Sequence, residues 1–167
     1  MLHHVSFNAR DPETSAQGLS QLLGARALHA PCPPFPQGAW FVCLGDEHGT
    51  LIEVMPWGET RDAARPNGVG HDPEMRQSSG SHVLVSTPLS EQEAMDIAAR
   101  YGWLAQPASA GLFKFVKIWV ENSFLIELLP PEYEADYRAA FGTSGISQLD
   151  QKLRQIEAES KARTTPD

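Results

Sequence analysis

The hexapeptide LIEVMP at residues 51–56 returns near the other end of the chain as LIELLP at residues 125–130. Each copy places a glutamate, Glu53 or Glu127, in the middle of an apolar run. A carboxylate among Leu, Ile and Val is costly unless something compensates its charge. The pattern therefore predicts an internal repeat in which each copy directs its glutamate to a site with a compensating charge.

The rest of the chain supports a repeat with a constant offset. When His4 is placed over His82, HVSFN lies over HVLVS, and Gly24 and Gly102 fall at the same offset, each closing a helical pattern. The two hexapeptides then match with a small length difference. That difference fits in one hairpin loop, GDEHG at 45–49 against the shorter ENS at 121–123, because such loops vary most easily in length.

Each half is predicted to contain one strand, one helix and three further strands. In the first half, Asp11 and Pro12 are typical of a helix N-terminus, and in the second half Ser90 and Glu93 form a capping box. The apolar stripes of the two helices are Ala16, Leu19, Leu22 and Leu23, then Ala94, Ile97, Ala98 and Tyr101. The sequence therefore predicts an α+β fold built from two tandem βαβββ modules.

These modules occupy residues 1–57 and 80–130 of a single domain. Residues 58–79 are polar and rich in Gly, Pro, Asp and Arg, which favours a linker. Residues 131–167 are predicted to form a helical extension, with one helix ending near Gly142 and a second capped by Ser147. The second helix would carry an apolar stripe of Leu149, Leu153 and Ile156.

Strand alternation decides which side chains share a face. His4 and His82 begin the first strand of each half, and Glu53 and Glu127 lie on the last strand, each opposite the most apolar side chains. The apolar face can pack under the helix, which leaves the His and Glu face for a concave interior. His3 points to the opposite face, although a register shift of one residue would exchange it with His4.

Two imidazoles and two carboxylates suit a borderline divalent ion such as Zn²⁺, Ni²⁺, Fe²⁺, Mn²⁺ or Co²⁺. A bound ion would also compensate the charge of both glutamates. The alternative is two unrelated histidines at strand starts and two solvent-facing glutamates on edge strands. The matched pairing in both halves favours the metal. Lys114 and Lys117, which flank Phe115 on a predicted strand, are interpreted as solvated surface cations.

Composition excludes several other classes of partner. Thirteen Lys and Arg against 21 Asp and Glu give a net charge of −8, which argues against binding to nucleic acid or to an anionic membrane. No apolar run is long enough to span a bilayer, and the N-terminus lacks the pattern of a signal peptide. Cys32 and Cys43 lack metal-site spacing and are expected to be reduced thiols in a cytoplasmic protein.

With these residues in place, the sequence resembles the vicinal oxygen chelate superfamily, which includes glyoxalase I, bleomycin-resistance proteins and extradiol dioxygenases. The resemblance covers residues 2–130, and LHHVSFNARDPETS followed by LLG is similar to the opening strand and helix of that family. It implies paired βαβββ modules whose mostly antiparallel sheet curls around one metal ion. The implied ligands are His4, Glu53, His82 and Glu127, the two-His, two-Glu set of glyoxalase I.

The resemblance implies a lyase or isomerase that moves a proton through a metal-stabilised enediolate of a small carbonyl substrate. Glu127 is the favoured base and Glu53 the second candidate, and a homodimer is the usual assembly. Asn8 stands where glyoxalase I usually has an arginine near the glutathione carboxylate, so the use of glutathione stays open. The alternatives are an extradiol-type dioxygenase, whose family members use two His and one Glu, and a non-catalytic small-molecule binding protein of the bleomycin-resistance type.

Overall fold

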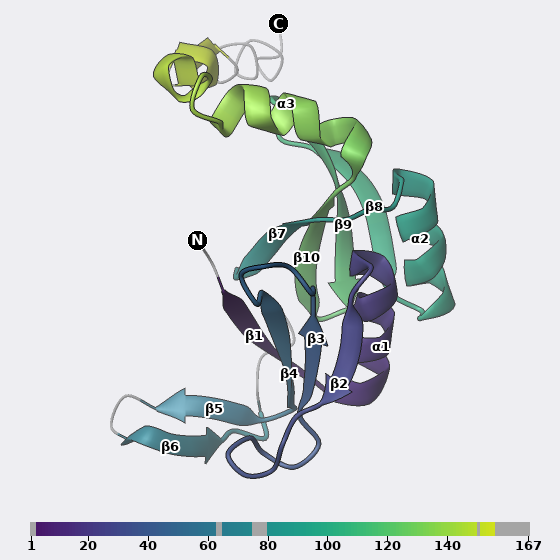
Figure 1. Ribbon diagram of the computed structural model, residues 1–167, viewed down its shortest axis with the longest axis vertical. Helices are drawn as coiled ribbons and strands as arrows, with labels where there is room; N and C mark the ends of the chain where they lie inside the picture. Colours follow the sequence, from purple (N-terminus) through teal and green to yellow (C-terminus); the bar gives the residue numbers. More distant parts are fainter. Residues whose placement is uncertain (1–2, 63–64, 75–79, 150, 156–167) are drawn as a thin grey trace, which may run out of the picture.

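The computed structural model describes residues 3–62, 65–74, 80–149 and 151–155 (Figure 1). The first module consists of β1 (His4–Ala9), α1 (Pro12–Leu23), β2 (Arg26–His29), β3 (Trp40–Cys43) and β4 (Leu51–Pro56). The second consists of β7 (His82–Ser86), α2 (Glu91–Arg100), β8 (Leu104–Ser109), β9 (Lys114–Val120) and β10 (Phe124–Leu129). The predicted α+β fold with two βαβββ modules is confirmed.

Each module forms its own four-stranded sheet with the same topology. The strand orders are β1-β4-β3-β2 and β7-β10-β9-β8, so the first and last strands of each module are neighbours. These neighbours run parallel, whereas the other two pairs in each sheet are antiparallel. The sheets are therefore mostly antiparallel, as predicted.

Local signals position both helices as the sequence predicts. The Asp11 carboxylate accepts a hydrogen bond of 3.0 Å from the backbone N–H of Thr14, and Pro12 stands in the first turn of α1. Gly24 ends α1 with a φ of 61°, a left-handed conformation that glycine adopts without steric cost. In α2, Ser90 and Glu93 form the predicted capping box.

A shared hydrophobic core joins the two modules. The helices α1 and α2 lie side by side on one side of the molecule (Figure 1), and the ring of Trp103 packs against Gly18 of α1. The rings of Phe7 and Phe124, one from each module, are stacked with centroids 4.4 Å apart. Fully buried residues from both modules include Leu19, Leu22, Val42, Val54, Ile118, Ile126 and Leu128.

Hydrogen bonds also cross between the modules at both ends of α1. At its N-terminus, the Glu121 carboxylate accepts bonds from the backbone N–H groups of Arg10 and Asp11 at 2.6 and 2.7 Å, and from the Ser15 hydroxyl at 3.0 Å. At its C-terminal end, the Thr87 hydroxyl donates to the Leu22 carbonyl. The second module therefore satisfies backbone groups that the helix cannot pair itself.

Three further elements lie outside the modules. The segment predicted as a linker contains a two-stranded hairpin, β5 (Glu59–Asp62) and β6 (Arg65–His71), which projects from the body in Figure 1. The helix α3 (Pro131–Phe141) packs Tyr133 and Tyr137 against a cluster that includes Phe113, Phe115 of β9, Leu84 of β7 and Leu129 of β10. A short 3₁₀ turn (Ile146–Gln148) follows. Ile156, the last residue of the apolar stripe predicted for the second C-terminal helix, lies outside the described residues. No helix in the described residues is long and apolar enough to cross a membrane.

Candidate metal centre

The first pair of predicted ligands lies on neighbouring parallel strands. His4 is paired with Leu51, and Ser6 with Glu53, so His4 and Glu53 share one face of the first sheet. The Ser6 hydroxyl donates a hydrogen bond to the Glu53 carboxylate. His4 is exposed and Glu53 is half-buried. His3 precedes β1, and its Nδ1 lies 3.1 Å from the carbonyl oxygen of His48, so the predicted register of His4 holds.

The second pair repeats this arrangement in the other module. His82 is paired with Leu125, and Leu84 with Glu127. The Nε2 atom of His82 lies 3.7 Å from a carboxylate oxygen of Glu127, and the two side chains are 49% and 13% exposed. No other charged partner or hydrogen-bond donor among the described residues reaches the Glu127 carboxylate. The structure therefore places one predicted His and one predicted Glu on the same face of each sheet, and it brings His82 and Glu127 within 3.7 Å of each other.

Strand alternation directs the apolar neighbours of each glutamate into the core and the carboxylate itself to the opposite face of the sheet. The neighbours Ile52 and Val54 of Glu53 are buried under α1, and the neighbours Ile126 and Leu128 of Glu127 are buried in the same core. Each carboxylate therefore emerges on the sheet face opposite α1 and α2. In the second sheet one end of this face is covered by α3, whose Tyr133 and Tyr137 pack with Leu84 and Leu129. This placement keeps the charges out of the core without requiring any partner inside it.

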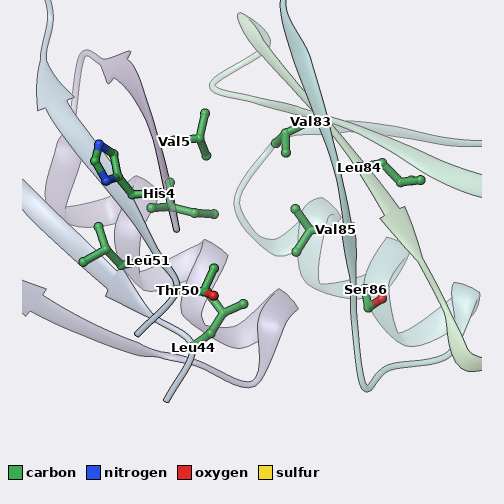
Figure 2. A pocket seen from close by; sticks show the side chains of 10 residues that line it. His4, Val5, Leu44, Thr50, Leu51, Val83, Leu84, Val85 and Ser86 are labelled. Carbon is green, nitrogen blue, oxygen red and sulfur yellow. The ribbon is translucent and has the colours of Figure 1, made fainter. Parts of the chain in front are cut away.

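A cleft of about 320 Å³ separates the first strands of the two modules. In Figure 2, Val5 of β1 and Val83 and Val85 of β7 point into this cleft. His4 points to the far side of β1, and Leu84, which shares a face with Glu127, points to the far side of β7. The two His–Glu pairs therefore face away from each other. Within the described residues, no three His, Cys, Asp or Glu side chains lie close enough to hold one metal ion.

The geometry of the second pair nevertheless fits a metal. Imidazole nitrogens and carboxylate oxygens bind Zn²⁺ at about 2.0–2.2 Å, so two ligands of one ion lie roughly 3–4 Å apart. The 3.7 Å between His82 and Glu127 falls in that range. The exposed face of His82 leaves room for further ligands. His82 and Glu127 thus offer two donors of the types suited to a borderline divalent ion.

Antiparallel pairing adds a residue that the sequence did not single out as functional. Lys117 of β9 is directly opposite Glu127, and Gln106 of β8 is opposite Lys117. Directly opposite residues of an antiparallel pair share a face, with Cβ atoms about 4.5–5.5 Å apart. Lys117 therefore lies on the same face as Glu127 and is half-buried. Only the register between β9 and β10 could have revealed this neighbour.

Solved structures with this fold include the fosfomycin resistance protein FosX from Listeria monocytogenes in its hexagonal form. It is 13% identical, covers 78% of this chain and 92% of its own length, and has a TM-score of 0.51. A mutant of the same protein, complexed with Mn(II) and 1S,2S-dihydroxypropylphosphonic acid, is 13% identical over 77% and 90% with a TM-score of 0.50. A possible glyoxalase from Bacillus cereus is 16% identical over 77% and 97%, with a TM-score of 0.45.

No protein-family model and no curated protein matches the sequence. The comparisons therefore establish an architecture, and together with the two βαβββ modules they show that the chain has the vicinal oxygen chelate fold.

Proposed function

We propose that the protein is a metal-dependent lyase or isomerase that transfers a proton on a small carbonyl substrate. The observation that carries this proposal is the repeated His and Glu on the sheet face opposite α1 and α2, with His82 and Glu127 3.7 Å apart. His4, Glu53, His82 and Glu127 would hold one divalent ion, either Ni, Zn, Fe, Mn or Co. Such an ion would supply Lewis acidity toward two adjacent oxygens of the substrate.

Within this site, Glu127 is our proposed base. Its carboxylate has no hydrogen-bond donor among the described residues, whereas the Glu53 carboxylate accepts the hydroxyl of Ser6. A carboxylate with free lone pairs can accept a proton from a carbon next to a carbonyl and return it to the neighbouring carbon. Glu53 remains the second candidate for this role.

We also propose that the complete site forms between two copies of the chain. The pairs face away from each other within one chain, so His4 and Glu53 of one copy would meet His82 and Glu127 of a second. A homodimer related by two-fold symmetry would contain two such composite sites. The two unpaired cysteines, Cys32 and Cys43, fit a reducing compartment such as the cytoplasm.

Complementation between inactive variants tests the composite site. One chain carries His4→Ala with Glu53→Ala, and the other carries His82→Ala with Glu127→Ala. After the two are mixed and re-associated, a composite site predicts that each heterodimer regains one intact ligand set and binds about one ion. If all four ligands came from one chain, every site would keep a defect and mixing would restore no metal binding.

Metal analysis of the purified protein, followed by turnover assays with 2-oxoaldehyde hemithioacetals and with acyl-CoA epimers, tests the reaction class. Oxygen consumption with a catechol would instead indicate the dioxygenase alternative. Tight binding of a small ligand by metal-free protein, without turnover, would indicate the binding-protein alternative. The FosX complex with Mn(II) and a dihydroxyphosphonic acid makes Mn²⁺ and small oxygen-rich phosphonates useful first probes.

A further inference from the structure

The row of side chains that crosses the second sheet through Glu127 is polar, unlike its counterpart in the first sheet. From β8 to β7 the register places in this row Gln106, Lys117, Glu127 and Leu84. The equivalent row of the first sheet, from β2 to β1, contains Leu28, Phe41, Glu53 and Ser6. The second module therefore carries a lysine and an amide where the first carries a phenylalanine and a leucine.

The Lys117 ammonium is available on this face. Its Nζ lies 5.9 Å from the centroid of the Phe115 ring, which holds the side chain along the sheet. No carboxylate of the described residues lies within ion-pair distance of it, including that of Glu127. A half-buried cation that has no carboxylate partner within the described residues, and that lies on a candidate site face, is well placed to receive an anionic ligand.

We propose that Lys117, with the Gln106 amide beside it, binds an oxyanion of the substrate next to the metal half-site. This inference rests on the proposed function, because a divalent ion on Glu127 would compensate that carboxylate and leave the charge of Lys117 for the ligand. An ammonium donates up to three hydrogen bonds and attracts carboxylate, phosphate or phosphonate groups. The substrate class is therefore a small molecule that bears two adjacent metal-binding oxygens and a separate oxyanion.

The experiment uses three hydroxamates that chelate a metal through two adjacent oxygens and differ in one group. Acetohydroxamate has no further charge, malonohydroxamate adds a carboxylate, and phosphonoacetohydroxamate adds a phosphonate. Calorimetric titration of the Mn²⁺-loaded full-length protein gives the three dissociation constants. We expect at least one of the charged probes to bind at least about tenfold more tightly than acetohydroxamate. The charged probe that binds more tightly relative to acetohydroxamate indicates whether the oxyanion of the substrate is a carboxylate or a phosphonate.

The variant Lys117→Met, which keeps a long apolar stem, should abolish the extra affinity of the charged probes and leave acetohydroxamate binding unchanged. Lys117→Arg should retain much of that extra affinity. The matched control is Lys114→Met, because Lys114 is exposed on the same strand and alternation directs it to the other face. Circular dichroism establishes that each variant is folded, and Lys117→Gln provides a second neutral substitution.

The outcomes separate this inference from the function on which it rests. If wild type binds Mn²⁺ and acetohydroxamate but gains nothing from either oxyanion, or if the gain survives in Lys117→Met, the role of Lys117 is overturned while the metal site stands. If the protein binds none of Mn²⁺, Ni²⁺, Zn²⁺, Fe²⁺ and Co²⁺, the proposed function is overturned and the metal-anchored role of Lys117 with it.

Discussion

The two modules share a topology and a ligand pattern, yet they surround their glutamates differently. In the first, Glu53 lies between Ser6, whose hydroxyl binds its carboxylate, and the ring of Phe41. In the second, Glu127 lies between Leu84 and Lys117, and the one ionisable group of the described residues within ion-pair distance of its carboxylate is His82. Duplication preserved the donor atoms while the neighbouring strand positions diverged. Residues equivalent as metal ligands can therefore differ as bases and in the substrate groups beside them.

The sharpest test of this difference substitutes each glutamate by its amide. Glu127→Gln should lower kcat/KM by about a thousandfold, within the usual contribution of a general base, because an amide cannot accept the proton. Glu53→Gln keeps an oxygen ligand and should cost about tenfold to a hundredfold. Steady-state kinetics with the substrate found in the turnover panel measures both, and thermal unfolding checks that both variants fold. Equal losses, or a larger loss for Glu53→Gln, would reverse the assignment of the base.

The repeat explains why much of the fold could be predicted from the sequence. The Asp11 cap and the Ser90–Glu93 capping box are local signals, and the offset between His4 and His82 shows that such signals recur in both halves. The structure confirms the elements that they predict. Alternation along a strand likewise placed each His and Glu on the face away from the helix. The helix caps and strand alternation depend on a few neighbouring residues, so they can be recognised without knowledge of the tertiary arrangement.

Other features depend on pairings between distant segments. The strand β6 has the sequence RPNGVGH, whose Pro, Asn and Gly residues are typical of loops, so the pattern indicated a linker. The opposition of Lys117 to Glu127 follows from the register of β9 and β10, which a shift of one residue would destroy. The outward direction of the two His–Glu pairs follows from helix packing between the modules, which no strand pattern encodes.

The two helices differ in the packing of the equivalent positions Gly18 and Asp96. A Cβ atom on Gly18 of α1 would lie 2.4 Å from the ring of Trp103, which is itself buried. Gly18→Ala should therefore destabilise the protein by about 1–3 kcal/mol, because a rigid indole must shift in a packed core. The equivalent residue of α2 is Asp96, an exposed position, and Asp96→Ala should be nearly neutral. Urea unfolding of both variants measures the contrast, and equal effects would contradict the asymmetric packing.

The N-termini of α1 and α2 also differ in the carboxylate that each accepts as a hydrogen-bond partner from another element of the fold. Glu121 binds three donors at the start of α1, whereas Glu132 of α3 accepts one bond of 2.9 Å from the backbone N–H of Glu91 at the start of α2. Glu121→Ala should cost about 1–2 kcal/mol, since it leaves two backbone donors and a buried Ser15 hydroxyl without this partner. Glu132→Ala should cost less. Urea unfolding at neutral pH orders the two, and a larger loss for Glu132→Ala would show that the contact between modules contributes little.

The smallest expected contrast concerns the caps within each module. Hydrogen bonds from Thr14 lower the pKa of Asp11 below its ordinary value of 3.8, and hydrogen bonds from Ser90 lower the pKa of Glu93 below 4.5. A carboxyl group with a lowered pKa in the folded state contributes stability above its unfolded pKa, and this contribution is lost as the pH falls through the folded pKa. Asp11→Ala and Glu93→Gln should each reduce stability at neutral pH and flatten its decline below about pH 4. Urea midpoints measured from pH 7 to pH 3 report these slopes. Because Asp11 alone caps α1 whereas Ser90 still caps α2 after Glu93→Gln, the change for Asp11→Ala should be the larger. The opposite order would show that the reciprocal bond of the capping box dominates.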